Sequence, residues 1–397
     1  MTIKNTLDIS EAASTNWDVL IIGAGPAGAL AALQLGKAGL KTLLIDRKSF
    51  PRYKVCGGCL NERTLSVVEQ AGLMPLLKDA GAIPIQELQI NSPRREVSVP
   101  LPHGVAFSRT RFDEILVTEA ITKGTEFLSE VTARLEELTP LGDQRRVELQ
   151  STDRKTVIAT ARIVLVADGL ANSSLKKYPQ HKSLSTTASR LGLGGILMEP
   201  PTGYDAGSIH MAVSPAGYVG LTQLEDGSLN LAAALNAPVL KQANSTSGLI
   251  QQIIQEAHLP EINNLDSVDW SGTIALTRTT TVKALPRTLR CGDAAGYVEP
   301  FTGEGIASAL CSGYLASTLV ASRIDSWGTA DEEEWSRLHR TEVQQRYQYC
   351  RWIARLSRYP RAVELALSTI NWFPGLTRPI IKHLNEPLAP VLVDAPS

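Results

Sequence analysis

Residues 17–46 read WDVLIIGAGPAGALAALQLGKAGLKTLLID, and this stretch decides the fold. An apolar run over 18–22 leads into a glycine turn, an Ala- and Leu-rich segment follows over 26–38, and a second apolar run covers 41–46. This order predicts a strand, a helix and a second strand, and two strands joined through a crossover helix are parallel. The sequence therefore predicts an α/β fold in which helices cover a parallel sheet.

The turn at 23–28, GAGPAG, has the spacing Gly-x-Gly-x-x-Gly directly after a strand and at the start of a helix. In that position the first glycine permits the turn, the second lets a pyrophosphate approach the backbone, and the third permits close packing of the helix. An acid at the end of the second strand accepts hydrogen bonds from ribose hydroxyls. The residues that we expect to bind a dinucleotide here are Gly23, Gly25, Pro26, Ala27, Gly28, Asp46 and Arg47.

Short alternating runs elsewhere in the chain predict antiparallel strands, and Asp226-Gly227 between two such runs marks a hairpin turn. Three further runs near 132–138, 144–150 and 155–160 predict a three-stranded antiparallel meander beside the parallel sheet. We therefore expect a substrate domain of 85–105 and 183–282, a discontinuous nucleotide-binding domain of 16–84, 106–182 and 283–325, and a C-terminal helical region of 326–397.

The composition is that of an ordinary folded enzyme, because 43% of the 397 residues are hydrophobic and 20% are charged. Lys plus Arg number 39 against 40 Asp plus Glu, so the chain has no overall positive charge to attract a nucleic acid. Five cysteines do not make a disulfide framework. Cys56 and Cys59 have the Cys-x-x-Cys spacing of a metal pair, but no second cysteine pair and no histidine cluster supplies the other two ligands of zinc. We therefore expect a cytoplasmic protein with no nucleic-acid partner and no metal site.

The two ends of the chain differ in character. Residues 1–16 are polar, which predicts a disordered start, and no run of 18 uncharged apolar residues predicts a membrane span anywhere. Residues 352–384 are rich in apolar and basic side chains. This tail is interpreted as a helical lid packed on the protein, with peripheral contact to a membrane surface as the alternative.

Two further segments, CGDAAG at 291–296 and PFTGEG at 300–305, precede a long apolar helix predicted over 305–324. With the glycine turn, they resemble FAD-dependent oxidoreductases of the glutathione-reductase type. The resemblance is to the branch that contains aromatic hydroxylases such as p-hydroxybenzoate hydroxylase, geranylgeranyl reductases and flavin-dependent halogenases. It implies a Rossmann-like FAD-binding domain with FAD as the cofactor.

In that family the aspartate of the first segment binds ribitol or ribose hydroxyls of FAD, and the second segment lies beside the flavin ring. Backbone amides at the start of the following helix would stabilise negative charge on the reduced flavin. A helix cap is the alternative role for Asp293. The residues implied at the flavin are Gly292, Asp293, Pro300, Gly303, Glu304, Gly305 and Ile306, and the resemblance makes Pro300, Gly303 and Gly305 catalytic candidates.

Two more matches extend the resemblance. The segment RTRFD at 109–113 is similar to one whose first arginine contacts the cofactor, which implies that Arg109 binds FAD. Asp168, followed by glycine at the end of an apolar strand, matches the Asp-Gly motif of the hydroxylases. The residues after this motif depart from the hydroxylase pattern, which weakens the inference that NAD(P)H binds there.

The segment FPRYKVCGG at 50–58 resembles the corresponding segment of geranylgeranyl reductases, in which the cysteine lies near the flavin ring. We expect Cys56 to line the active site as a catalytic candidate. Three roles remain open for it. It can fill space beside a tight turn, form a redox pair with Cys59, or contact the substrate.

The expected substrate contacts lie on the antiparallel sheet and in the loop at 300–305. They are His210, Tyr218 and Phe301, although strand alternation does not say which face of the sheet points inward. The hairpin segment GYVGLTQL at 217–224 differs from the aromatic substrate signature of geranylgeranyl reductases. This difference indicates another substrate.

The predicted function is therefore an FAD-dependent oxidoreductase, a single-component monooxygenase that hydroxylates a small apolar or aromatic metabolite. Molecular oxygen and transient NADPH or NADH are its expected co-substrates. The alternatives are a geranylgeranyl-reductase-like enzyme that reduces isoprenoid double bonds, an enzyme supplied by a partner reductase, and a flavoprotein that oxidises a partner polypeptide. Halogenation is disfavoured, because the Trp-x-Trp-x-Ile-Pro motif of that branch is missing.

Overall fold

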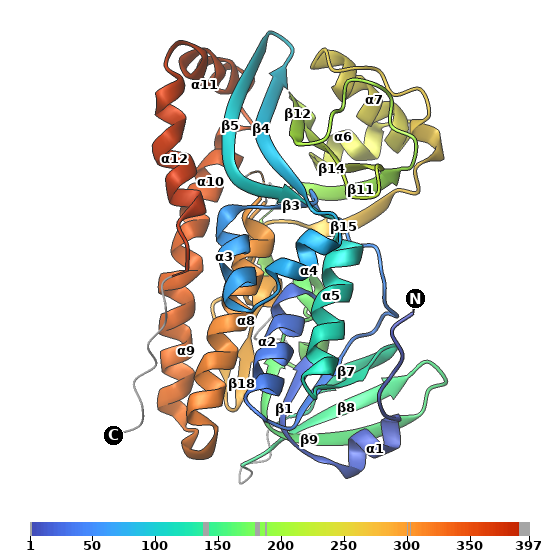
Figure 1. Cartoon of the computed structure of the whole chain (residues 1–397), viewed down its shortest axis with the longest axis vertical. Coiled ribbons are helices and arrows are strands. Elements are labelled where there is room, and N and C mark those ends of the chain that lie inside the picture. Colours follow the sequence, from blue (N-terminus) through green and yellow to red (C-terminus); the bar gives the residue numbers. More distant parts are fainter. Residues whose placement is uncertain are drawn as a thin grey trace.

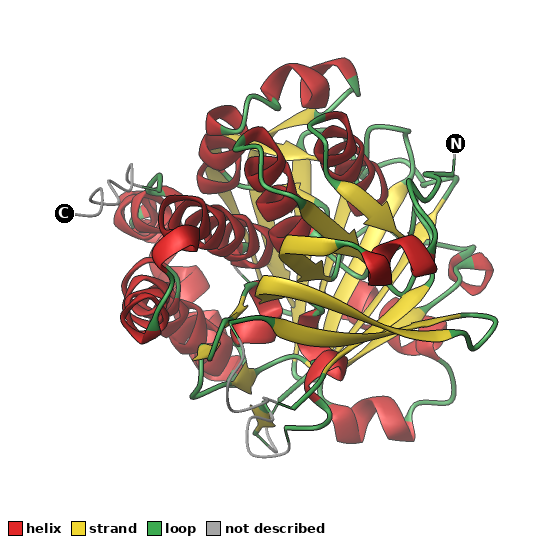
Figure 2. Cartoon of the chain, turned by 90° about the horizontal axis from the view of Figure 1, so that it is seen from below, coloured by secondary structure: helices red, strands yellow, loops and turns green. Residues whose placement is uncertain are grey.

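The computed structural model describes residues 2–137, 143–178, 183–186, 189–299, 301 and 303–388. Figure 1 shows two large sheets, one above the other, with the C-terminal helices along one side of both. Figure 2, seen from below, shows the strands in the middle of the molecule with helices around them.

The lower sheet has a core of five parallel strands in the order β18-β9-β1-β2-β6. Their bounds are β18 Thr288–Arg290, β9 Thr156–Val166, β1 Asn16–Ile22, β2 Thr42–Ile45 and β6 Glu126–Leu128. An antiparallel strand β17 (Ala284–Leu285) extends one edge. The meander is formed by β7 (Val131–Leu135), β8 (Arg145–Ser151) and the first part of β9. The predicted α/β fold with a parallel sheet and an antiparallel meander is thereby confirmed.

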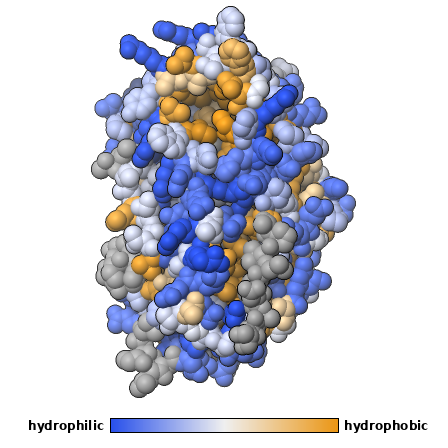
Figure 3. Space-filling view, turned by 90° about the vertical axis from the view of Figure 1, so that its left-hand side faces the viewer, coloured by the Kyte–Doolittle hydropathy of each residue, from blue (hydrophilic) through white to orange (hydrophobic). Residues whose placement is uncertain are grey.

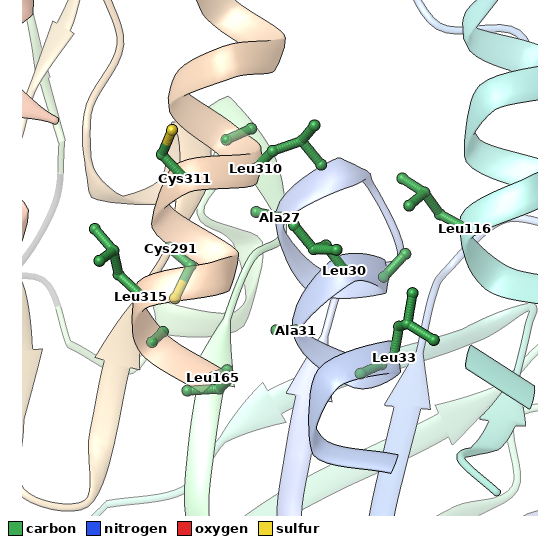
Figure 4. Close-up of a cluster of buried hydrophobic side chains, with 14 of the residues drawn as sticks. Ala27, Leu30, Ala31, Leu33, Leu116, Leu165, Cys291, Leu310, Cys311 and Leu315 are labelled. Atoms are coloured by element: carbon green, nitrogen blue, oxygen red, sulfur yellow. The ribbon is translucent and has the colours of Figure 1, made fainter. Parts of the chain in front are cut away.

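Three helices pack on one face of this sheet, namely α2 (Pro26–Lys37), α5 (Arg109–Thr122) and α8 (Glu304–Arg323). Figure 4 shows α2 between the other two, with Leu310 of α8 and Leu116 of α5 directed toward it. The approach of α8 to α2 depends on a glycine, since a Cβ atom at Gly313 would lie 2.2 Å from the carbonyl oxygen of Ala27. Two shorter helices follow the first β-α-β unit, α3 (Glu62–Gln70) and α4 (Met74–Asp79).

The upper sheet has the strand order β15-β11-β14-β13-β12-β4-β5-β3, and it is antiparallel except where β12 pairs with β4. Helix α7 (Thr246–Glu256) covers one of its faces, and the short helix α6 (Ala237–Gln242) precedes it. A separate pair of short strands consists of β10 (Leu184–Ser185) and β16 (Arg278–Thr279). The bounds are β15 Ser271–Ala275, β11 Leu191–Leu197, β14 Leu229–Leu235, β13 Gly217–Gln223, β12 Ser208–Ser214, β4 Ile83–Ser92, β5 Arg95–Ala106 and β3 Cys59–Leu60.

The described part of the C-terminal segment is mostly helical. It forms α9 (Thr329–Glu342), α10 (Tyr347–Leu356), α11 (Pro360–Trp372) and α12 (Thr377–Asn385). In Figure 1 these helices run along both sheets, and α11 reaches the long hairpin of β4 and β5. The cavity described below therefore has a wall that the sheets alone do not provide.

Two sequence predictions are corrected. The start of the chain is ordered, because Asp8 and Glu11 form a capping box for helix α1 (Ile9–Ser14), and Ile3 and Thr6 donate backbone hydrogen bonds to the parallel-sheet half of the chain. The run predicted at 155–160 and the apolar strand predicted before Asp168 are one continuous strand, since β9 belongs to both the meander and the parallel core.

One described helix is long and apolar enough to cross a bilayer by its length and composition, and this segment is Glu304–Ser326. Most of its apolar window, 72%, is buried inside the protein against α2 and α3. Helix α8 is thus the central helix of the core.

Candidate active site

One large cavity runs through the middle of the molecule, with a volume of about 1050 Å³. It begins at the glycine turn after β1, passes beneath the inner face of the upper sheet and ends between β4, β5 and the helices α11 and α12. A volume of this size lies at the upper end of the range for small-molecule and cofactor sites. This single cavity is therefore large enough to contain both a dinucleotide end and a substrate end.

The dinucleotide end is formed by the turn at 23–28 and by Asp46. A Cβ atom at Gly28 would lie 1.9 Å from the carbonyl oxygen of Gly23, so only glycine permits the helix to start this close to the strand. At Gly25 the nearest heavy atom to such a Cβ would be 3.8 Å away, which leaves this backbone open to the cavity. Asp46 accepts hydrogen bonds from the amides of Ala24 and Lys48, both at 2.9 Å, and keeps lone pairs for a ribose.

Cationic side chains line the wall next to this turn. Arg109 donates two hydrogen bonds, of 2.9 and 2.8 Å, to the carboxylate of Asp113. Burial alone would lower the pKa of Arg109, but the Asp113 carboxylate outweighs burial and the net shift is upward. Arg52 lies 3.5 Å from Asp113 and 3.6 Å from Asp46, so one guanidinium links the two acids. These cations suit the pyrophosphate of a dinucleotide.

Asp168 and Asp293 are both among the residues that line the cavity. Asp293 lies in the turn Gly292–Ala295, where burial raises its pKa and the charges of Lys54 and Arg109 oppose that rise. Asp168 accepts a 2.8 Å hydrogen bond from the amide of Ser174 through one oxygen, while its other oxygen is buried without a partner. Burial likewise raises the pKa of Asp168.

Two structural observations indicate that the residues at this end fit FAD. The Asp168 Oδ1 and Arg52 Nε atoms are both buried without a hydrogen-bond partner, and both residues line the cavity, so a polar ligand would satisfy them. The glycine cradle leaves backbone exposed at Gly25, where a pyrophosphate binds in the predicted arrangement.

The start of α8 forms the next part of the cavity. Gly303, in the left-handed region with φ +71°, is the N-cap, and it provides no side-chain cap for the first turn. Gly303, Gly305 and Ile306 line the cavity, so the unpaired amides at the start of a long helix could stabilise negative charge on a ligand bound there. Pro300, expected as a catalytic residue, lies outside the described residues.

The side chain of Glu304 is not among the described residues that line the cavity, so its predicted contribution to FAD binding is left to its backbone amide. It is buried on the other side of α8, near Arg63 and Arg346, and neither carboxylate oxygen has a hydrogen-bond partner. Burial raises the pKa of Glu304 to about 7, although the two arginines oppose this rise. Only its backbone can act on a ligand in the cavity.

Residues 53–57 form one side of the cavity, and Cys56 is among them. The carbonyl oxygen of Cys56 accepts a 2.9 Å hydrogen bond from Asn230 on β14, which ties this segment to the upper sheet. Cys59 contacts Thr222, and burial raises the pKa of its thiol to about 12. Both thiols are free, and a thiol with this pKa is protonated at neutral pH, which disfavours the redox pair.

The substrate end has an aromatic part and an aliphatic part. The rings of Tyr218 and Phe301 pack edge to face with centroids 4.9 Å apart, and both residues line the cavity. Beyond them the wall is aliphatic, with residues from the upper sheet on one side and from α11 and α12 on the other. These residues are Leu88, Ile90, Val99, Met211, Val213, Val363, Leu367, Ile370 and Ile381.

His210 does not reach the cavity, which corrects its expected role as a substrate contact. On β12 the residues Ile209 and Met211 face the cavity, so the alternation of the strand directs His210 to the opposite face. There its ring packs against Tyr204 with a centroid distance of 5.2 Å.

Behind Tyr218 lie two residues that the sequence analysis did not identify, Arg190 and Glu299. The Arg190 guanidinium lies 5.4 Å from the Tyr218 ring centroid and donates a 2.7 Å hydrogen bond to Glu299, and both charged side chains are fully buried. Arg190 also donates hydrogen bonds to the hydroxyl and carbonyl oxygens of Ser357. No local motif joins these residues, because 109 positions separate Arg190 from Glu299.

Comparisons with known proteins agree with this geometry. The model of the FAD binding domain family matches residues 16–339. The menaquinone reductase of Mycolicibacterium smegmatis is 24% identical over 343 residues, covering 82% of each chain. The digeranylgeranylglycerophospholipid reductase 2 of Methanopyrus kandleri is 27% identical over 329 residues, covering 79% of each chain.

Among solved structures, a geranylgeranyl bacteriochlorophyll reductase-like protein from Thermoplasma acidophilum superposes with a TM-score of 0.70 and 18% identity. The match covers 93% of this chain and 99% of that protein. At this identity the likeness shows a shared fold, and it extends over the antiparallel sheet as well as the nucleotide-binding half.

Proposed function

The chain belongs to the FAD binding domain family and is an FAD-dependent oxidoreductase, and from that premise we propose that it reduces double bonds in the prenyl chain of a lipid substrate. The observation that carries this proposal is the aliphatic end of the cavity between β4, β5, α11 and α12. A long channel lined by Leu, Ile, Val and Met side chains suits a flexible hydrocarbon chain. The relatedness to reductases of menaquinone and of a digeranylgeranylglycerophospholipid supports the same substrate class.

In the proposed site the glycine turn and Asp46 would hold the adenosine and pyrophosphate part of FAD, and Asp293 and the start of α8 its flavin part. When bound and reduced by NADPH or NADH, FAD would supply the hydride for the reaction. The amides at Gly305 and Ile306 would stabilise negative charge at the flavin edge. The aliphatic walls orient the prenyl chain and exclude water.

Reduction of a double bond also requires a proton, and Tyr218 is the residue that we place in this role. Its ring packs on Phe301, two positions before the helix cap Gly303, and its buried hydroxyl lies beside the Glu299 carboxylate, to which it can donate a hydrogen bond. Burial raises the pKa of Tyr218 well above 10, so Oη retains its proton at neutral pH. Tyr218 can then donate that proton as the hydride adds to the other carbon of the double bond.

A monooxygenase that hydroxylates an apolar or aromatic metabolite is the second candidate. It is favoured by the edge-to-face pair of Tyr218 and Phe301, which suits a planar aromatic ring. In either case the aliphatic lining favours a small molecule over a partner polypeptide. We retain the expectation of a cytoplasmic protein, in keeping with a sequence whose five cysteines do not make a disulfide framework.

An anaerobic experiment separates the two candidates. The holoenzyme is reduced with NADPH, or with dithionite if NADPH fails, and is then mixed with geranylgeranyl-containing lipid. The proposal expects recovery of the oxidised flavin spectrum without oxygen, together with lipid product that has gained two hydrogen atoms. Reoxidation that requires oxygen, with an oxygen atom added to an aromatic or apolar substrate, would establish the monooxygenase instead.

A further inference from the structure

The outer face of α10, α11 and α12 exposes an unusual concentration of large apolar side chains. Of thirteen such exposed residues in the described chain, nine lie between positions 349 and 380. Trp372 is 76% exposed and Trp352 is 65% exposed. We call this surface the C-terminal apolar face, and its residues are Tyr349, Trp352, Leu356, Tyr359, Leu365, Trp372, Phe373, Leu376 and Ile380.

Basic side chains accompany these apolar residues. The segment 349–388 contains six basic residues, Arg351, Arg355, Arg358, Arg361, Arg378 and Lys382, but only two acidic ones, Glu364 and Glu386. Both acids lie near arginines outside the segment, since Glu364 is 3.9 Å from Arg95 and Glu386 is 3.2 Å from Arg346. Four of the basic residues, Arg355, Arg361, Arg378 and Lys382, are exposed, whereas Arg358 is partly buried and lies 3.5 Å from Glu299. The exposed part of this face therefore carries a local excess of positive charge.

The cavity opens at the same face. Leu356 and Ile380 line the cavity and are also 49% and 50% exposed, so they stand at its mouth. Figure 3 looks onto this side of the molecule and shows apolar residues gathered around a hollow near its upper end. The apolar wall of the cavity thus continues onto the exposed surface.

We propose that the C-terminal apolar face docks onto a bilayer that contains anionic lipid. Tryptophan and tyrosine favour the headgroup region of a membrane, and exposed apolar residues beside them enter the acyl boundary. The basic residues are complementary to anionic headgroups, which attract arginine and lysine near the surface. A patch that is aromatic, aliphatic and basic at once fits this partner better than a second copy of the same face, because the basic residues of the two copies would then repel one another.

Docking in this way would place the mouth of the cavity against the acyl chains. A prenyl chain embedded in the bilayer would then enter the cavity without crossing water. This second step rests on the proposed function, whereas the docking itself does not. The two are tested separately.

The test of docking uses the FAD-loaded full-length enzyme and flotation with vesicles. One set of vesicles is pure phosphatidylcholine, and the other contains 30 mol% phosphatidylglycerol at the same total lipid. We expect flotation with the anionic vesicles, with weaker binding at high salt because charge attraction is screened. Lipids brominated in their acyl chains should quench part of the tryptophan fluorescence, and the quenching should shrink in Trp372→Ser.

Two double variants separate the contributions of charge and apolar insertion. Arg378→Glu with Lys382→Glu should weaken binding to anionic vesicles by at least about 25-fold, because each basic residue near an anionic surface contributes about fivefold. Trp372→Ser with Phe373→Ser should weaken binding to both kinds of vesicle. None of these four residues lines the cavity, so reduction of a detergent-dispersed substrate should be unchanged.

Matched controls change similar residues on other surfaces. Met198→Ser removes an exposed apolar residue, and Lys78→Glu with Lys241→Glu reverses two exposed charges on α4 and α6. These variants should float as well as the original chain. Flavin absorbance and the melting temperature confirm that each variant is folded.

The outcomes are distinguishable. Absence of flotation, or equal losses in the control variants, overturns the docking proposal. A concentration-dependent dimer that Trp372→Ser disrupts, without vesicle binding, would assign the face to a second copy instead. Docking without any prenyl reduction would overturn the proposed function alone, while reduction in detergent without docking would overturn only the proposal made in this section.

Discussion

Replacing Glu299 with glutamine tests how strongly the buried ion pair behind Tyr218 holds the cavity together. Arg190 and Glu299 are both fully buried, with 2.7 Å between their charged atoms. Arg190 also binds Ser357 and Asn236, so a single guanidinium joins the upper sheet, the segment before α8 and the end of α10. Glutamine keeps the shape of Glu299 but leaves the Arg190 charge buried without a counter-charge.

The magnitude follows from this burial. Breaking a buried pair by removing one charge costs about 3–5 kcal/mol. The second arginine near Glu299, Arg358 at 3.5 Å, is partly exposed and should add less than about 1 kcal/mol. Replacing both partners, with Arg190→Met and Glu299→Leu, removes the uncompensated charge. The double variant should therefore recover most of the lost stability.

The assay is urea unfolding followed by far-UV circular dichroism and by flavin fluorescence, because coincidence of the two transitions tests for a single cooperative step. FAD affinity is measured in parallel, since bound cofactor itself adds to the free energy of unfolding. The matched control is Glu334→Gln, which breaks an exposed 2.6 Å pair with Arg337 and should cost less than about 1 kcal/mol. If Glu299→Gln costs no more than this control, the reasoning about the buried pair is refuted.

Three further predictions concern cofactor binding, the reaction and the pH dependence of stability. Gly25→Ala should leave the unfolding free energy of the FAD-free protein unchanged, since a methyl group there meets no atom within 3.8 Å, but should weaken FAD binding at least about tenfold in a flavin fluorescence titration. Tyr218→Phe should slow prenyl reduction at least about 100-fold in stopped-flow measurements, without changing FAD affinity. Glu304 has a folded-state pKa of about 7 against 4.5 in the unfolded chain, so the folded state binds more protons and stability falls as pH rises through this window. The original chain and Glu304→Gln should have similar free energies of unfolding at pH 4.5. By pH 7.5 the original chain should have lost on the order of 3 kcal/mol of unfolding free energy relative to the variant. Equal pH profiles of the two proteins in urea unfolding would contradict this assignment.

The dinucleotide end could be predicted from the sequence because its parts are local. The glycine turn and Asp46 belong to one β-α-β unit, and the spacing alone places them together. The capping box of Asp8 and Glu11 was also visible as an acid followed three residues later by glutamate, although the polar composition around it indicated disorder.

The substrate end could not be predicted in the same way. Strand alternation allows either face of β12 to point toward the cavity. The pairing of β12 with β4 and the packing of α7 on the sheet, which are tertiary contacts, determine that His210 lies on the face away from the cavity. The Arg190 and Glu299 pair depends on contacts between segments far apart in the chain. No periodic pattern encodes such a contact, because each side chain is matched to its environment only after the sheets have formed.

The C-terminal helices that close the cavity are held to the protein by little buried surface. Within α11 only Leu367 is fully buried, and within α12 no residue of 377–385 is. Segments with few buried apolar contacts open locally at a low free-energy cost. The same helices expose their aromatic residues on the outer side, so a bilayer that covers Trp372 and Phe373 would stabilise them in a way that water does not. The wall of the cavity is therefore weakest where, in the proposed function, a lipid chain would enter, and the proposed docking would be coupled to substrate entry through α11 and α12.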